Sequence, residues 1–168
     1  MSRVEINFPE VTHFSTELSV RIGDVNQANH LGHDRMITMI HEARIQFFKA
    51  LGYEELEIEG VGTVIADLAV SYQNEAFYGD YLRFDISVQG ISRKSCQFIY
   101  RVIRTTDSIS EDNGHRSNKA INKPSLTEKS EELIALAKTG VVFFDYALRK
   151  SAAVPAGFIE QLDKRLAK

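Results

Sequence analysis

The chain has 168 residues, one cysteine and a formal net charge of −3 at neutral pH. This length fits one domain with its own core, and no segment approaches the about 18 consecutive apolar residues that span a bilayer. The lone cysteine cannot form an internal disulfide and the N-terminus lacks an apolar signal core, so we expect a cytoplasmic protein without membrane partners. Because the net charge is acidic, we also expect no nucleic-acid partner.

Hydrophobic periodicity predicts a strand and then a long helix in the first third of the chain. In residues 16–22 apolar side chains alternate with polar ones, which is typical of a half-buried strand. In residues 33–51 apolar side chains are too frequent for a narrow stripe. This density predicts a central helix that is covered on most of its sides.

Four strand-like runs follow the helix, at residues 60–76, 80–92, 94–106 and 132–148. Short turns at Gly79 and Arg93 indicate antiparallel hairpins between consecutive runs. The order of elements predicts a single α+β domain with an antiparallel sheet. Because one sheet cannot surround a helix that is apolar nearly all round, we expect a homodimer to complete the cover.

Two further segments complete the single domain, 1–168. Residues 107–131 have almost no apolar content, which predicts a mobile polar loop. Residues 155–168 carry apolar side chains at helical spacing, which predicts a C-terminal amphipathic helix packed on an edge or a partner.

The stretch "GDVNQANHLGHD", directly before the predicted helix, is unusually rich in polar side chains. Together with "VR" before it and "HEAR" in the helix, it resembles the hotdog-fold acyl-CoA thioesterases of the 4-hydroxybenzoyl-CoA thioesterase type. Their pattern runs V-R-x-x-D-x-D-x-x-G-H-x-x-N and is followed by a helix with E-A-R. The resemblance covers about residues 15–105 and the last strand.

This resemblance implies the hotdog fold, in which a five-stranded antiparallel sheet wraps a long central helix. It implies hydrolysis of an acyl-CoA or acyl-carrier-protein thioester by a homodimer or homotetramer, without a cofactor. Three positions depart from the pattern. Asn26 replaces the second aspartate and cannot take up a proton, Asn29 replaces the glycine, and His33 replaces the asparagine.

The start of the predicted helix offers groups that polarise a thioester carbonyl. Backbone N–H groups in the first turn of a helix have no partner within it, and the helix dipole is positive there. We therefore expect an oxyanion hole at Gly32, His33 and Asp34. The amide of Asn26 can hold or orient the attacking water.

Four residues are candidates for the remaining acid–base role. His30 can accept a proton near neutral pH, and Asp24 can orient its imidazole. Glu42 lies further along the helix, and Asp67 is a lone carboxylate in an apolar strand. Structural alternatives remain open. His30 can be a loop histidine bonded to backbone, and Asp24 a turn or cap residue. Glu42 can form a helix ion pair with Arg44 or a nearby cation, and Asp67 can lie in a dimer contact.

The tip "SRKS" places Arg93, Lys94 and Ser95 together on a predicted hairpin, as in the turn that meets the nucleotide arm of coenzyme A in some family members. Basic hairpin tips also serve solubility alone. Cys96 within a strand is interpreted as a core residue. His33 and His41 have no third ligand at a suitable spacing, so we expect no metal site.

Two other functions remain open. Hotdog-fold hydratases and dehydratases share a D-x-N-P-x-H motif, but here His30 lies six residues after Asp24 and no proline follows Asn26. A non-catalytic acyl-thioester-binding protein is the second alternative, because the acid at position 26 is missing.

Overall fold

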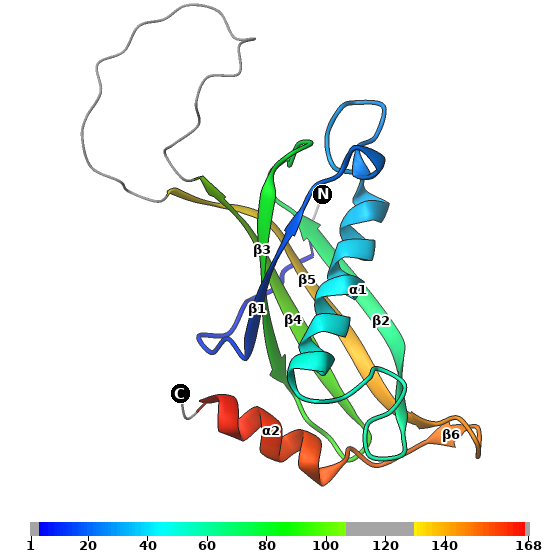
Figure 1. The fold of residues 1–168 in the computed structure, drawn as a ribbon. Coiled ribbons are helices and arrows are strands. Elements are labelled where there is room, and N and C mark those ends of the chain that lie inside the picture. Colours follow the sequence, from blue (N-terminus) through cyan, green and yellow to red (C-terminus); the bar gives the residue numbers. More distant parts are fainter. Residues whose placement is uncertain (1–3, 107–129, 167–168) are drawn as a thin grey trace, which may run out of the picture.

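The computed structural model describes residues 4–106 and 130–166 as a six-stranded antiparallel sheet with a long helix against one face (Figure 1). The elements in chain order are β1 (Phe14–Ser19), the 3-10 helix η1 (Ile22–Asp24), α1 (His33–Ala50), β2 (Gly62–Tyr72), β3 (Tyr81–Gln89), β4 (Ser95–Thr106), β5 (Ser130–Asp145), β6 (Lys150–Ser151) and α2 (Ala156–Leu166). The predicted α+β class is confirmed. Apart from its last two residues, which belong to β5, the predicted polar loop 107–131 lies outside the described residues.

The helix α1 packs one side against the concave face of the sheet. Its buried residues recur at intervals of three and four: Met36, Met39, Ile40, Ala43, Arg44, Phe47 and Phe48. The ring of Phe47 meets that of Phe98 on β4 edge-on, at 5.5 Å between centroids. Burial of each such side chain contributes roughly 1.5–3 kcal/mol, so this aromatic contact anchors the helix to the sheet.

The other side of α1 is polar and exposed, through Asp34, Arg35, Thr38 and Glu42. A single chain therefore leaves this side of α1 uncovered, and the expected cover by a second copy stays a prediction. Some of the apolar residues of the predicted helix lie between the side of α1 that faces the sheet and the exposed side. Ile37, for example, is 37% exposed.

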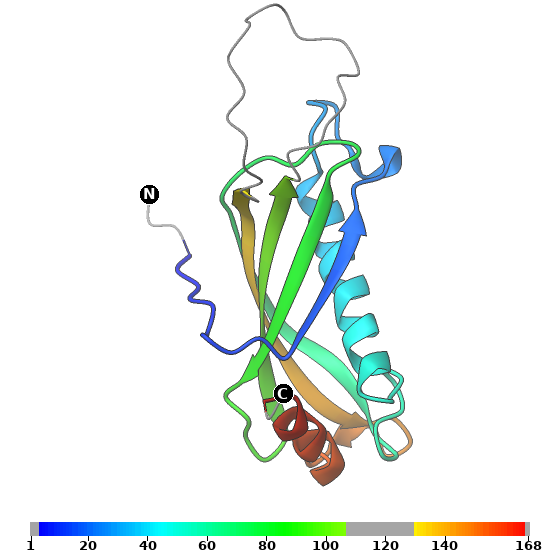
Figure 2. The same cartoon turned by 60° about the vertical axis from the view of Figure 1, so that its left-hand side comes forward.

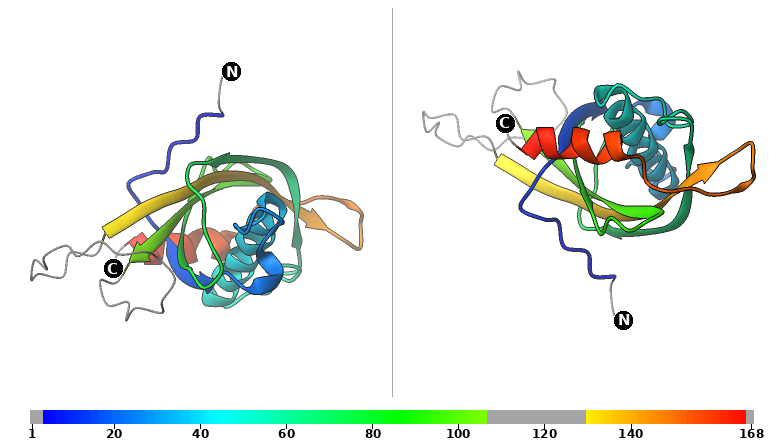
Figure 3. Two further views of the ribbon diagram at one scale, coloured as in Figure 1. Left: turned by 90° about the horizontal axis from the view of Figure 1, so that it is seen from above. Right: turned by 90° about the horizontal axis from the view of Figure 1, so that it is seen from below.

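The strand order is β1-β3-β4-β5-β2, with β6 paired to β5. The hairpin predicted at Arg93 exists between β3 and β4, but the one predicted at Gly79 is wrong because β2 and β3 do not pair. β5 inserts between β4 and β2 and pairs with both. Residues 73–80 therefore form a crossover that passes over the end of the sheet where α1 begins (Figure 3).

The first strand is shorter than predicted. β1 ends at Ser19, and Ile22 lies in η1 with 73% of its surface exposed. Asp24 stabilises this turn because its carboxylate accepts the Arg21 backbone N–H at 2.9 Å. The apolar alternation of residues 16–22 thus ends before Ile22.

The two ends of the chain pack on different parts of the sheet. Residues 4–13 run along the face opposite α1 (Figure 2), where Phe8 lies 4.4 Å from the guanidinium of Arg101. A C-terminal helix was predicted at residues 155–168, and α2 spans Ala156–Leu166. Residues 167 and 168 lie outside the part of the chain that the structure describes. Phe158 of α2 is fully buried against Phe143 and Phe48.

No helix within 4–106 and 130–166 is long and apolar enough to cross a membrane. The cytoplasmic location stays a prediction.

His13 joins the N-terminal segment to β3. Its Nδ1 accepts the backbone N–H of Val88 at 3.2 Å, and its residue surface is 8% exposed. Burial lowers the pKa of His13, and Arg165 adds to this effect while Asp163 opposes it. The folded chain therefore favours the neutral imidazole.

This pKa shift predicts a pH-dependent contribution to folding stability. An unfolded chain binds the proton more readily, so the contribution is complete above pH about 6.5 and is lost as the pH falls below it. We expect the difference in unfolding free energy between the wild type and His13→Gln, measured in urea, to be smaller at pH 5.5 than at pH 7.5. All other pH-dependent contributions are common to the two proteins and cancel in this difference. An equal or larger difference at pH 5.5 would contradict the prediction.

Candidate active site

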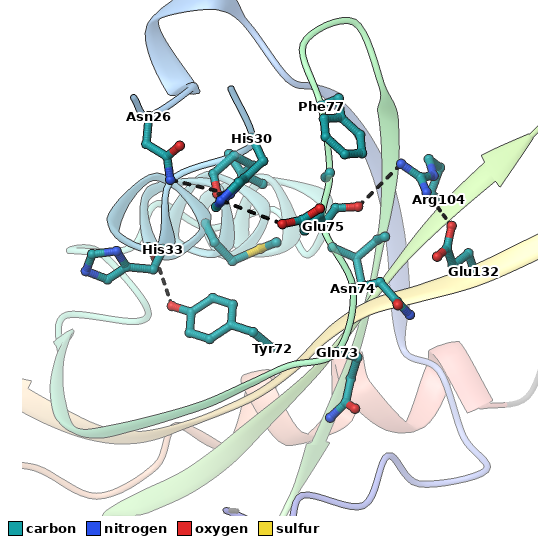
Figure 4. Close-up of a pocket in the computed structure, with 14 residues that line it drawn as sticks. Asn26, His30, His33, Tyr72, Gln73, Asn74, Glu75, Phe77, Arg104 and Glu132 are labelled. Atoms are coloured by element: carbon teal, nitrogen blue, oxygen red, sulfur yellow. Dashed lines mark hydrogen bonds and ion pairs between the residues drawn. The ribbon is translucent and has the colours of Figure 1, made fainter. Parts of the chain in front are cut away.

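A cavity of about 560 Å³ opens where α1 begins (Figure 4). Its walls come from the loop that precedes α1, from the crossover after β2 and from the ends of β4 and β5. The lining residues are Asn26, His30, Leu31, His33, Met36, Tyr72, Gln73, Asn74, Glu75, Ala76, Phe77, Arg104, Glu132 and Ile134. Three predicted site residues, Asn26, His30 and His33, therefore meet in one place.

The loop before α1 is closed by its own backbone. Asn26 donates its N–H to the His30 carbonyl at 2.9 Å, and its carbonyl accepts the N–H of Asn29 at 3.0 Å. Asn29 has a φ of 63°. Glycine adopts this left-handed conformation freely and asparagine tolerates it better than most residues, which explains how Asn29 can stand where the family pattern has glycine.

The backbone N–H groups at the start of α1 differ in their availability. Leu31 donates to the Ala76 carbonyl at 2.7 Å, and Gly32 donates to the Asp24 carbonyl at 2.9 Å. Within the described residues, the N–H of His33 has no hydrogen-bond acceptor, and His33 lines the cavity. Of the three predicted oxyanion positions, Gly32 is thus already engaged and Asp34 is not among the lining residues.

His30 lies between an amide and a carboxylate (Figure 4). Its Nδ1 is 3.4 Å from Nδ2 of Asn26 and 3.3 Å from the Leu31 carbonyl. Its Nε2 is 3.8 Å from Oε1 of Glu75 on the crossover. The imidazole therefore connects the loop before α1 with the opposite wall of the cavity.

Tyr72, the last residue of β2, closes one side of the cavity. Its hydroxyl donates to the His33 carbonyl at 2.9 Å. Burial raises the pKa of Tyr72, and the nearby carboxylate of Asp34 raises it further. The phenol is therefore a neutral donor at physiological pH.

The crossover is held by Arg104 of β4. The guanidinium binds the Asp80 carboxylate at 2.7 Å, the Glu132 carboxylate, and the backbone carbonyl of Glu75 at 3.4 Å. On the far side, the side chain of Asn74 donates to the Leu133 carbonyl at 2.8 Å. These contacts fix the crossover in front of the loop that carries His30.

Asp24 and Glu42, two predicted catalytic residues, lie outside the cavity. The Asp24 carboxylate bonds the backbone of Arg21 and does not contact His30. Glu42 accepts a hydrogen bond from Gln46 at 2.9 Å on the exposed side of α1, about 13 Å further along the helix axis than His33. The ion pair suggested between Glu42 and Arg44 is wrong, because Arg44 binds Glu55 at 2.8 Å.

Asp67 points away from α1 because of a β-bulge. The pairing register of β2 with β5 shifts between Ile65 and Asp67, so these two residues lie on opposite faces of the sheet. The Asp67 carboxylate accepts the backbone N–H of Gly140 at 3.1 Å. A uniform alternation along β2 would place Asp67 and Ile65 on the same face.

The basic tip at residues 93–95 lies at the other end of the sheet from the cavity. Ser95 of β4 is level with Val142 of β5, which is level with Val64 near the start of β2. Tyr72, at the cavity, ends the same strand. Lys94 is bound there by Ser151, whose Oγ is 2.8 Å from Nζ. A single chain therefore does not bring the predicted phosphate-binding residues to the cavity.

Sequence reasoning missed Glu75, Tyr72 and Arg104. All three lie at the ends of predicted strands, where no spacing marks them. The one available signal is the polar run "YQNE" at residues 72–75, which does not alternate as a strand should.

Neither a metal centre nor a cysteine nucleophile is apparent in the described part of the chain. No group of three or more potential metal-binding side chains occurs among those residues. Cys96 faces the core, and burial raises the pKa of its thiol to about 12. Such a thiol carries almost no thiolate at neutral pH.

Comparison with known proteins places this chain in a family. A family model described as the thioesterase-like superfamily matches residues 20–162. The chain belongs to this superfamily. Among proteins of curated function, none matches.

Solved structures share the fold at low sequence identity. A mutant 4-hydroxybenzoyl-CoA thioesterase, crystallised with 4-hydroxybenzoyl-CoA, is 21% identical, with a TM-score of 0.70 over 89% of this chain and 97% of that one. A 1,4-dihydroxy-2-naphthoyl-CoA thioesterase from Synechocystis is 16% identical, with a TM-score of 0.67 over 89% and 95%. A thioesterase superfamily protein from Jannaschia sp. CCS1 is 14% identical, with a TM-score of 0.71 over 94% and 85%. The predicted hotdog fold is confirmed.

The role of Arg104 in holding the crossover leads to a prediction. In Arg104→Met the Asp80 carboxylate, which also accepts the backbone N–H of Phe77 at 2.9 Å, loses its cation. A hydrogen bond to a charged group contributes about 1.5–3 kcal/mol, so we expect hydrogen exchange of the Phe77 amide to quicken at least ~10-fold.

Arg83→Met is the matched control. Arg83 binds Asp85 at 3.0 Å and Glu131 at 2.7 Å, and none of the three lines the cavity. Equal exchange of the Phe77 amide in the two variants would show that Arg104 does not hold the crossover.

Proposed function

We propose that the protein hydrolyses an acyl-CoA or acyl-carrier-protein thioester at the start of α1. The backbone N–H of His33 supports this most directly. His33 lines the cavity, and its backbone N–H lies at the positive end of the α1 dipole and has no acceptor among the described residues. A group of this kind stabilises a carbonyl oxygen that becomes negatively charged.

The proposed reaction is addition of water to the thioester carbonyl. The His33 N–H binds the carbonyl oxygen as it gains charge, and one such donor is typically worth ~3 kcal/mol of the barrier. The carbon–sulfur bond then breaks, and the products are a carboxylic acid and a thiol. The apolar lining residues Met36, Phe77 and Ile134 offer a surface for the acyl group.

A second candidate function is binding of an acyl thioester without hydrolysis. Asn26 favours it, because a neutral amide occupies the position of the acid in the family pattern. Its Oδ1 already accepts the backbone N–H of Ala28 at 2.9 Å. Asn26 therefore has one acceptor site fewer with which to hold water than the sequence suggested.

We further propose that two copies of the chain pair along β2. This strand is at the edge of the sheet, and its inward-facing Ile65, Leu68 and Tyr72 are each 40–42% exposed, beside Ile37 of α1. An unpaired edge with apolar side chains is suited to pairing with a second copy of itself.

Two-fold pairing along β2 also brings the basic tip to the cavity. In an antiparallel pair, the start of one β2 lies beside the end of the other. Because Ser95 is level with Val64, the tip of the second copy then lies beside Tyr72 of the first. Arg93, Lys94 and Ser95 can bind coenzyme A phosphates only in this arrangement, across the interface.

Release of free thiol from a panel of acyl-CoAs tests the proposed function. We expect turnover with at least one acyl chain, and a decrease of at least ~10-fold in His30→Ala, because the His30 imidazole lies in the cavity between Asn26 and Glu75. An unchanged circular dichroism spectrum would verify the fold of the variant. Binding of acyl-CoA without thiol release for any chain length would favour the binding protein instead.

The mass in solution tests the proposed pairing. We expect a dimer by light scattering at micromolar concentration, and at least ~10-fold weaker association in Leu68→Lys, because a charge then enters the apolar edge. Leu148→Lys is the control, since Leu148 is 61% exposed in the turn between β5 and β6. A monomeric wild type would refute the pairing.

A further inference from the structure

The orientation of the Asn26 amide determines which ring nitrogen of His30 carries the proton. The Asn26 Oδ1 accepts the backbone N–H of Ala28 at 2.9 Å, so the amide cannot turn over without losing this bond. Its Nδ2 therefore faces Nδ1 of His30 at 3.4 Å. An amide nitrogen only donates, and Nδ1 must accept.

With Nδ1 as an acceptor, neutral His30 carries its proton on Nε2, the nitrogen that faces Glu75. The opposite tautomer would direct an Nδ1 hydrogen toward the Leu31 carbonyl, 3.3 Å away, and against the hydrogens of the Asn26 amide. The single lone pair of the neutral ring is thus occupied. The hydrogen on Nε2 then faces the Glu75 carboxylate at 3.8 Å, an ion-pair distance and not a direct hydrogen bond, and His30 has no free site for the proton of a water molecule.

Glu75 is the carboxylate in the cavity that no arginine neutralises. Of the described lining residues, Glu75 and Glu132 carry carboxylates. Glu132 is bound by Arg104, whereas the ion-pair contact of Glu75 is with His30 at 3.8 Å. The Glu75 side chain is 65% exposed, which gives water access to its oxygens.

The backbone around Glu75 is held on both sides. Its own carbonyl accepts from Arg104 at 3.4 Å, and the next carbonyl, of Ala76, accepts the N–H of Leu31 at 2.7 Å. The second bond joins the Glu75 segment directly to the loop that carries His30. The approach of the carboxylate to the imidazole is therefore a consequence of the fold.

From this geometry we infer that Glu75 is the catalytic base of the site and that His30 is its positioning residue. The inference rests on the proposed hydrolase function. The Glu75 carboxylate takes a proton from water as the water oxygen bonds to the thioester carbon, while the His33 N–H holds the carbonyl oxygen. When the carbon–sulfur bond breaks, the leaving sulfur takes this proton from Glu75, and the carboxylate is restored.

Substitution of Glu75 tests the inference, with the chain length that the wild type hydrolyses best. A positioned general base contributes typically about 10²–10⁴-fold, so we expect Glu75→Gln to lower kcat at least ~100-fold with little change in KM. Glu17→Gln, on the exposed surface of β1, is the matched control and should retain wild-type kcat.

A second substitution tests whether Glu75 acts as a base or has only a structural role. Asn26 also lines the cavity on the other side of His30, so Asn26→Asp supplies a carboxylate there. We expect the double variant Asn26→Asp/Glu75→Gln to recover at least ~10-fold in kcat over Glu75→Gln alone. A loss that this change does not relieve would mean that Glu75 only supports the crossover, and the inference would fail.

The tautomer of His30 can be measured without any substrate. We expect ¹⁵N chemical shifts of the neutral ring to show the proton on Nε2, and a proton on Nδ1 would overturn the inference. An active enzyme whose kcat is unchanged in Glu75→Gln would overturn it while leaving the proposed function intact. A wild type that hydrolyses no thioester would instead remove the proposed function, and the role of Glu75 with it.

Discussion

The hydrogen bond from the Leu31 N–H to the Ala76 carbonyl, 2.7 Å long, is the link on which the candidate site depends. Leu31 ends the loop that precedes α1, and Ala76 lies in the crossover between β2 and β3. The two segments meet because β5 stands between β4 and β2, so the chain after β2 must pass over the end of the sheet to reach β3. The position of one long strand thus decides that a cavity forms at the start of α1.

Some of the acidic side chains at this cavity are paired with an arginine and others are not. Arg104 binds both Asp80 and Glu132, so these two carboxylates add little negative potential near the helix N-terminus. This matters because an uncompensated carboxylate close to an oxyanion opposes the charge that the helix dipole stabilises. Glu75 has no arginine partner among the described residues and lies against His30, on the crossover wall. The cavity can therefore hold a base and an oxyanion site together.

Hydrophobic patterns within short segments predicted most helices and strands. They did not predict which strands pair or which distant residues meet. The bounds of α1 follow from apolar spacing within one segment, and the predicted range of 33–51 differs from the observed helix by one residue. The hairpin predicted at Gly79 is wrong because a turn at a glycine does not determine whether the two flanking strands pair with each other. The sequence left the direction of Asp67 open, because a bulge inserts one residue without a mark in the sequence. Glu75 was missed for the same reason as the crossover, since its contact with His30 spans 45 residues of chain.

The same topology explains why one chain holds only part of the machinery that the sequence suggested. The start of α1 and the tip at residues 93–95 lie at opposite ends of the sheet, and nine residues of β3 separate them by roughly 30 Å. The proposed reacting groups of the cavity all belong to one chain, whereas in the proposed pairing the basic tip comes to the cavity from a second copy. Loss of the proposed β2 pairing should therefore weaken the grip on the phosphates of coenzyme A before it disturbs the chemistry, because the contacts that position His30, His33 and Glu75 do not cross that interface.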